Sequence, residues 1–140
     1  MNVAVAVITD VKKKRVLLTR RAKEGTFGGL WEFPGGKLKA GETPVCALIR
    51  EIKEEVGLTV KKHHFLGKIP HNYPEYSVTL WVYLVASFSG EPTCQESQSG
   101  MCWADIAALD QFEFPEANKK IINLINNIAH LEAMSDLANA

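Results

Sequence analysis

The hydrophobic and polar positions along the chain predict strands that alternate with helices. Residues 3–9 and 15–20 are short runs rich in β-branched and aliphatic side chains, and we expect them to pair as a hairpin. Residues 77–88 form the longest predicted strand, and because both faces are apolar we expect it to be central and covered on both sides. Residues 70–75 are predicted as a polar connection. Shorter strands are predicted at residues 30–33, 64–69 and 101–104.

Two longer segments have the periodicity of amphipathic helices. For residues 44–56, Thr43 suits the amino-terminal cap, Pro44 the first turn and Gly57 the carboxyl end. The apolar stripe expected to pack on the core consists of Val45, Leu48, Ile49, Ile52 and Val56. The last helix begins at Pro115 and has an apolar face made of Ile121, Ile122, Leu124, Ile125 and Ile128.

This order of elements indicates an α/β protein in which a mixed β-sheet lies between helices, an α/β/α sandwich. The 140 residues are enough for a domain with its own core, and 46% hydrophobic and 23% charged residues are usual in globular proteins. We therefore expect one domain over residues 1–140, with residues from about 130 to 140 as a frayed tail.

Charge and composition argue against several classes of partner. The formal net charge is zero, so no basic excess favours binding of a nucleic acid polymer. No run of 18 apolar residues predicts a membrane span. The three cysteines lack a zinc-like spacing and are typical of reduced thiols. We expect a cytoplasmic monomer without a membrane or nucleic acid partner.

The helix at residues 44–56 carries a cluster of acids. Glu51, Glu54 and Glu55 are three and four positions apart and share one face, where like charges repel one another unless a cation is bound. Carboxylate oxygens on a rigid helix suit Mg²⁺, with Mn²⁺ as an alternative, and Mg²⁺ usually takes its other ligands from water and phosphates. Before the helix, the glycine-rich loop at residues 34–36 can approach a metal or phosphate closely. The alternative is an acidic face in contact with solvent.

The spacing of these residues resembles the signature of the Nudix hydrolases. Every fixed position of that signature is present, namely Gly36, Glu42, Arg50, Glu51, Ile52, Glu54, Glu55, Gly57 and Leu58. The similarity extends over roughly residues 3 to 125 and is strongest to the MutT branch. It implies the Nudix fold and hydrolysis of 8-oxo-dGTP to 8-oxo-dGMP and pyrophosphate. Such an activity cleanses the nucleotide pool and prevents replication errors.

The resemblance also implies roles for particular residues. Glu51, Glu54, Glu55 and the backbone carbonyl of Gly35 are implied metal ligands, and Glu96 is a further one from the loop after the long strand. Without the resemblance, Glu96 would be an ordinary loop acid.

The general base and two basic residues follow from the same comparison. We expect Glu51 to accept the proton of the attacking water, with Glu54 or Glu96 as alternatives. Arg50 is expected to pair with a glutamate of the signature and orient the carboxylates. Lys37 is expected either to contact phosphate or to cover the surface.

Asn118 is the candidate for reading the base. In 8-oxoguanine N7 carries a hydrogen, so the O6/N7 edge offers one acceptor and one donor, which matches a single asparagine amide. Plain guanine would place the N7 lone pair against the amide oxygen. The alternative is an ordinary residue of the first turn of the last helix.

Four other side chains are candidates for substrate binding. Arg21 is expected either to contact substrate or to be a solvated charge at a strand end. Phe33 and Tyr73 are expected either to stack on the base or to pack in the core. Glu75 is a candidate for an acidic contact to the base.

Two other functions compete with this prediction. One is a Nudix pyrophosphatase for CTP, dCTP or another nucleotide, which need not carry Asn118. The other is a non-catalytic module that binds a nucleotide or damaged DNA, but such modules typically lose glutamates of the signature, which are complete here.

Overall fold

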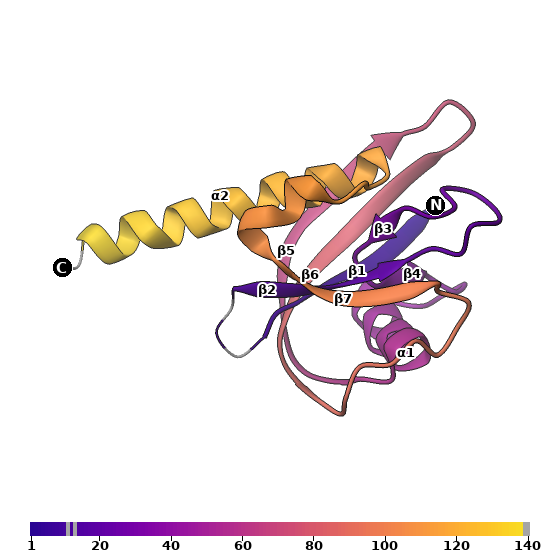
Figure 1. The fold of residues 1–140 in the computed structure, drawn as a ribbon, viewed down its shortest axis with the longest axis horizontal. Coiled ribbons are helices and arrows are strands. Elements are labelled where there is room, and N and C mark those ends of the chain that lie inside the picture. Colours follow the sequence, from indigo (N-terminus) through magenta and orange to yellow (C-terminus); the bar gives the residue numbers. More distant parts are fainter. Residues whose placement is uncertain (11, 13, 139–140) are drawn as a thin grey trace.

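The computed structural model describes residues 1–10, 12 and 14–138, with the side chains of all of these except residues 129–138. In chain order the elements are β1 (Asn2–Ile8), β2 (Arg15–Arg20), β3 (Trp31–Glu32), β4 (Gly35–Lys37), α1 (Pro44–Val56), β5 (Thr59–Asn72), β6 (Ser77–Ser89), β7 (Gly100–Asp105), the 3₁₀ helix η1 (Ile106–Gln111) and α2 (Glu116–Ala138). Figure 1 shows α1 and α2 on opposite sides of the strands, the α/β arrangement expected from the sequence.

The strands form two sheets. The four-stranded sheet has the order β4-β1-β6-β5, and in it β1 is parallel to β6 while the other neighbours are antiparallel. The three-stranded sheet has the order β3-β2-β7 and is antiparallel. The predicted hairpin is wrong, because β1 and β2 lie in different sheets and the described residues join them only by a bridge between Thr9 and Val16. Both edges of β1 are occupied, one by β4 and the other by β6, so neither edge is left to pair with β2.

Alternate residues of β1 face two separate cores. Ala4 and Ala6 pack with α1, whereas Val5 and Val7 pack with the first turns of α2. As predicted, β6 is a central strand with buried residues on both faces. The two cores therefore fix α1 and α2 on opposite faces of the four-stranded sheet.

Helix α1 begins and ends where the sequence predicts. Oγ1 of Thr43 accepts a hydrogen bond from the backbone N–H of Cys46 at 3.2 Å, and Pro44 occupies the first turn. Gly57 ends the helix with φ of 74°, in the left-handed region that favours glycine, and its N–H donates to the carbonyl of Lys53.

The buried face of α1 differs from the predicted stripe at one position. Leu48, Ile52 and Val56 are fully buried, as predicted, but Ile49 is 41% exposed. Successive residues differ by about 100° around a helix, so Ile49 lies beside the line through Leu48 and Ile52. Glu55 takes part in the buried face instead.

Strand β5 is longer than predicted and leads into the site described below. It includes Pro70, so the connection predicted at residues 70–75 is wrong in its first part. Pro70 is tolerated because β5 is an edge strand that pairs only with β6. Beyond the strand, the hydroxyl of Tyr73 accepts a hydrogen bond from the backbone N–H of Ala117 in the first turn of α2 (3.0 Å).

Helix α2 packs on the four-stranded sheet through Ile121 and Ile125. The predicted frayed tail falls on the end of this helix, whose backbone continues to Ala138, and on residues 139–140, which lie outside the described residues. Within the described part of the chain, none of the helices combines the length and the apolar character that a membrane span requires.

Candidate active site

Carboxylates from α1 and from the loop between β6 and β7 meet at one place on the surface. Glu51, Glu54 and Glu96 each contribute an oxygen, and these oxygens lie within 4.8 Å of one another. Glu51 and Glu54 face the same way because they are three positions apart on α1, whereas Glu96 is brought to them by the loop. Three carboxylates this close repel one another in the absence of a cation. Hard oxygen donors in this number fit Mg²⁺ or Mn²⁺.

Arg50 links these carboxylates to the segment before α1. Its guanidinium donates to both oxygens of Glu42, each at 2.8 Å, and to Oε1 of Glu51 at 2.6 Å and Oε2 of Glu54 at 3.1 Å. It also donates to the carbonyl of Lys37 at 3.1 Å. The guanidinium is therefore directed at protein groups, and its fork geometry holds the carboxylates in fixed positions.

The ion pair between Arg50 and Glu42 stays charged over a wide pH range. The hydrogen bonds from Arg50, with help from the backbone N–H of Lys39, lower the pKa of Glu42 to about 2. The same contacts with Glu42, joined by Glu51, raise the pKa of Arg50.

Glu55 lies apart from the other acids of α1. Its side chain is buried between the sheets, where its oxygens accept hydrogen bonds from the backbone N–H of Gly35 at 2.9 Å and the hydroxyl of Thr19 at 3.2 Å. Burial, together with the negative charge of Glu32, raises the pKa of Glu55 to about 7. Glu55 is not one of the three clustered acids among the described residues, although it lines the same cavity as Glu51 and Glu96.

The glycines before α1 are required by close packing. The predicted glycine-rich loop is in part a strand, β4, which pairs with β1. A Cβ at Gly36 would lie 2.3 Å from the carboxylate of Glu51, and a Cβ at Gly35 would lie 2.1 Å from the carbonyl oxygen of Ala4. Only glycine at position 36 leaves room for Glu51 to reach its place in the cluster.

Two adjoining cavities make up the site. The smaller, of about 240 Å³, is lined by Glu51, Glu55 and Glu96 among others. The larger, of about 360 Å³, extends toward the start of α2. Both are lined by Arg21, Glu32 and Gly35. A single ligand can therefore place an anionic end near the carboxylates and a ring in the larger cavity.

Arg21 and Glu32 form an ion pair where the cavities meet. Nη1 of Arg21 lies 3.1 Å from Oε2 of Glu32, and Nε of Arg21 donates to the carbonyl of Thr26 at 3.0 Å. Burial raises the pKa of Glu32, while the positive charge of Arg21 opposes this shift. Glu32 was missed in the sequence because a single acid in a two-residue strand has no spacing pattern.

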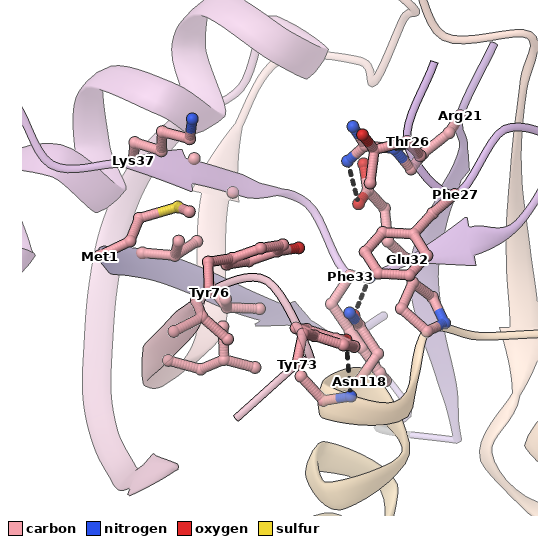
Figure 2. Close-up of a pocket in the computed structure, with 18 residues that line it drawn as sticks. Met1, Arg21, Thr26, Phe27, Glu32, Phe33, Lys37, Tyr73, Tyr76 and Asn118 are labelled. Atoms are coloured by element: carbon pink, nitrogen blue, oxygen red, sulfur yellow. Dashed lines mark hydrogen bonds and ion pairs between the residues drawn. The ribbon is translucent and has the colours of Figure 1, made fainter. Parts of the chain in front are cut away.

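Asn118 reaches from the first turn of α2 into the larger cavity. Its Oδ1 accepts a hydrogen bond from the backbone N–H of Phe33 at 3.2 Å (Figure 2). This bond fixes which way the amide faces. The ring of Phe33 lines the cavity but is only 3% exposed and stacks on Phe114 with a centroid distance of 5.7 Å. Phe33 is therefore a core residue and a cavity wall at once.

An aromatic group covers another side of the larger cavity. The ring of Tyr73 lies 5.1 Å from that of Phe27 and 5.2 Å from that of Tyr76, and all three residues line the cavity (Figure 2). Phe27 has φ of 58°, the one positive value among the described non-glycine residues. Phe27 and Tyr76 were missed as site residues, since an isolated aromatic in a loop is more often a packing residue.

Two predicted residues lie differently from expectation. Glu75 is exposed at the turn between β5 and β6 and lines neither cavity, so its predicted contact with the base is not supported by its position. Its neighbour Tyr76 lines the larger cavity in its place. Lys37 also lines the larger cavity, near Met1 in Figure 2, but not the cavity bordered by the carboxylates.

Comparison with known proteins relates this site to an enzyme family. The family described as NUDIX domain matches residues 4–124. The 8-oxo-dGTP diphosphatase of Escherichia coli (strain K12) is 37% identical over 122 residues, or 87% of this chain and 93% of the relative. The 8-oxo-dGTP diphosphatase of Haemophilus influenzae is 39% identical over 116 residues, or 83% and 85%. The crystal structure of a MutT NUDIX hydrolase from Burkholderia pseudomallei matches with a TM-score of 0.80 at 28% identity, covering 89% of this chain and 96% of that one.

Proposed function

The chain belongs to the NUDIX domain family, and we propose that it hydrolyses oxidised nucleoside triphosphates, with 8-oxo-dGTP converted to 8-oxo-dGMP and pyrophosphate. The observation that carries the proposal is the junction of two cavities at Arg21, Glu32 and Gly35. One cavity has carboxylates suited to a metal-bound triphosphate, and the other has room for a purine and contains Asn118. The relatives named 8-oxo-dGTP diphosphatases support the same substrate.

Glu51, Glu54 and Glu96 would hold Mg²⁺, or Mn²⁺ in its place, with Glu55 and the carbonyl of Gly35 as the remaining predicted ligands. When bound, the metal neutralises phosphate oxygens and makes water a better nucleophile. Arg50 positions these ligands: because Glu42 anchors its guanidinium, its hydrogen bonds hold the carboxylates of Glu51 and Glu54 in place. The loss of such orienting partners typically reduces metal affinity or activity by about 10–100-fold.

Removal of the proton from the attacking water requires a carboxylate within hydrogen-bonding distance of that water. We propose Glu51 as this base, with Glu54 and Glu96 as alternatives. Glu51 has one oxygen held by Arg50 and borders the smaller cavity, where a phosphate chain would lie. Its position is further restricted by the close approach to Gly36.

Selection of the oxidised base is proposed to rest on Asn118. Phe33 N–H donates to one lone pair of Oδ1, which leaves a second lone pair to accept the N7 hydrogen of 8-oxoguanine. The amide nitrogen can then donate to O6. Plain guanine has no hydrogen at N7, so its lone pair would face Oδ1. A buried site built for one hydrogen-bond pattern can discriminate by roughly 10⁴-fold.

The test is the value of kcat/KM for 8-oxo-dGTP beside dGTP, CTP and dCTP with Mg²⁺, followed by pyrophosphate release. We expect a preference for 8-oxo-dGTP over dGTP of at least about 100-fold, given one mismatched buried hydrogen bond. The variant Glu51→Gln should lose at least about 100-fold in kcat, whereas Glu91→Gln, at an exposed position of the β6–β7 loop, should not.

Other outcomes would change the proposal in different ways. Efficient hydrolysis of a cytosine nucleotide would keep the carboxylate chemistry and overturn the assignment of the base. No hydrolysis of any of the four nucleotides would remove the proposed reaction altogether.

A further inference from the structure

The loop that supplies Glu96 is tied to the last turn of α1 on its amino-terminal side. The backbone N–H of Thr93 donates to the carbonyl of Val56, and that of Gln95 donates to the carbonyl of Glu55, each at 3.0 Å. These carbonyls have no partner within the helix, because they belong to its last turn. The loop therefore follows α1 up to the residue before Glu96.

Gln98 supplies a second attachment just after Glu96. Its Nε2 donates to the carbonyl of Glu55 at 3.2 Å, and its Oε1 accepts a hydrogen bond from the backbone N–H of Glu96 at 3.0 Å. One side-chain amide thus connects the backbone of a clustered acid to the helix that carries the other two. Gln98 also lines the smaller cavity.

We propose that Gln98 is a positioning residue that holds Glu96 beside Glu51 and Glu54, so that α1 and the loop present one metal-binding group. The proposal rests on the proposed function, since it assumes that these three carboxylates bind a divalent metal. Arg50 pairs with Glu51 and Glu54, which lie on the rigid helix α1, whereas Glu96 is an exposed acid on a loop. Its backbone is therefore the part that needs an attachment.

The amide of Gln98 suits this task because it both donates and accepts. A carboxylate at position 98 could accept from Glu96 N–H but would repel the carbonyl of Glu55, and an apolar side chain could do neither. The two bonds leave the Glu96 carboxylate itself free, since they involve only its backbone N–H. Gln98 thus acts on Glu96 without occupying either oxygen of its carboxylate.

The same loop offers a matched control in Gln95. Its side-chain amide donates to Oγ1 of Thr93 at 3.0 Å, and in the described part of the chain it makes no hydrogen bond to Glu96 or to α1. The variants Gln98→Met and Gln95→Met make the same change of shape and polarity three residues apart. Methionine has a similar length and no hydrogen-bonding amide.

The experiment measures Mn²⁺ affinity of the full chain without nucleotide, from the electron paramagnetic resonance signal of free Mn²⁺. We expect Gln98→Met to bind Mn²⁺ about 10–100-fold more weakly than the unchanged protein, as is usual for the loss of an outer partner of a ligand. Gln95→Met should stay within about twofold. Activity of Gln98→Met should recover as Mn²⁺ is raised, a rescue that a collapsed loop would not show.

Each other result has a definite meaning. Equal weakening in both variants would show that the loop needs its polar residues for folding alone, and would overturn the role of Gln98. Unchanged affinity in Gln98→Met would overturn it as well, while leaving the metal site in place. Absence of Mn²⁺ binding by the unchanged protein would overturn the metal site and the role of Gln98 together.

Discussion

At several positions of this site, packing against neighbouring groups restricts which residue fits and how its side chain is oriented. Gly36 has no side chain because the carboxylate of Glu51 fills the space where a Cβ would be. Asn118 is oriented by the backbone of Phe33, which lies 85 positions earlier in the chain. In both cases a residue distant in sequence determines what the position can do.

Replacement of Asn118 by alanine tests base reading at the residue scale. Asn118→Ala should reduce the preference for 8-oxo-dGTP over dGTP by about 10-fold or more, because one or two hydrogen bonds of about 1–1.5 kcal/mol each are lost with the oxidised base. Turnover of dGTP should change little. The measurement is the ratio of the two kcat/KM values. Asn126→Ala, an exposed change on the same helix, is the control, and an unchanged ratio in Asn118→Ala would remove Asn118 from recognition.

Phe27 is a second test at this scale because its backbone is strained. A non-glycine residue at φ of 58° costs about 1 kcal/mol or more, whereas asparagine tolerates this region. Phe27→Asn should relieve this strain but lose the contact between the rings of Phe27 and Tyr73, which is worth about 1 kcal/mol. Because the two effects are similar in size and opposite in sign, the urea midpoint of unfolding should stay nearly the same. KM for 8-oxo-dGTP should rise severalfold, since the cavity loses an aromatic wall. Phe27→Tyr keeps the ring and should keep KM; a KM unchanged in Phe27→Asn would contradict this role.

At the scale of elements, α1 serves the core and the site with different faces. Leu48 and Ile52 fix the helix on the four-stranded sheet, and Glu51 and Glu54 project from the adjoining face. Glu55 lies between these faces and is buried against β2 and β4 through its bonds to Thr19 and Gly35. A carboxyl group in that place makes the packing of α1 depend on pH.

The prediction for α1 concerns the stability of the metal-free protein. Glu55 has a pKa of about 7 when folded and near 4.5 when unfolded, so between these values the folded state binds a proton that the unfolded state releases. Stability should therefore fall as pH rises from about 4.5 to 7, by up to about 3 kcal/mol. Glu55→Gln should flatten this dependence and be the more stable protein at pH 8. Urea unfolding in EDTA at pH 5 and pH 8 measures the effect.

A control separates this effect from other acids. Glu91→Gln at an exposed loop position should leave the pH dependence of the unfolding free energy unchanged. If Glu55→Gln showed the same pH dependence as the unchanged protein, the buried carboxyl would not be its source.

The ion pair of Glu42 affects stability in another pH range. Because its folded pKa is lowered to about 2, its contribution is present above about pH 4.5 and is lost as pH falls toward 2.

At the scale of the whole molecule, the site exists only where several segments meet. The carboxylates come from α1 and the β6–β7 loop, while the larger cavity takes residues from the segment between β2 and β3, the turn between β5 and β6, and the start of α2. Binding at this junction should therefore stabilise the fold as a whole.

Addition and removal of a divalent metal test whether binding at this junction stabilises the whole fold. A ligand at 100 times its dissociation constant stabilises the folded state by about 2.7 kcal/mol, which raises Tm by roughly 5–10 °C for a chain of this length. We expect such a shift with Mn²⁺ or Mg²⁺ and its reversal by EDTA. Potassium chloride at the same ionic strength is the control. Equal Tm values with and without the divalent ion would contradict a metal site that joins α1 to the loop.

Local patterns in the sequence predicted both long helices, the central strand β6 and the acids of the site. The caps at Thr43 and Gly57 predicted the ends of α1, because capping depends on residues adjacent in the chain. The spacing of Glu51 and Glu54 placed both on one helical face for the same local reason. The family resemblance, carried by fixed positions in one short segment, is confirmed by relatives that are 37–39% identical.

Which groups from distant parts of the chain meet depends on how the elements pack. This packing separated Glu55 from Glu51 and Glu54 by burying it against Gly35 and Thr19, and it placed β1 and β2 in different sheets. It also brought Glu32 and Phe27 to the cavities, although neither has a pattern in the sequence. Periodicity reports the face of an element on which a side chain lies; the partner on that face depends on how elements pack, and packing joins residues that no local spacing connects.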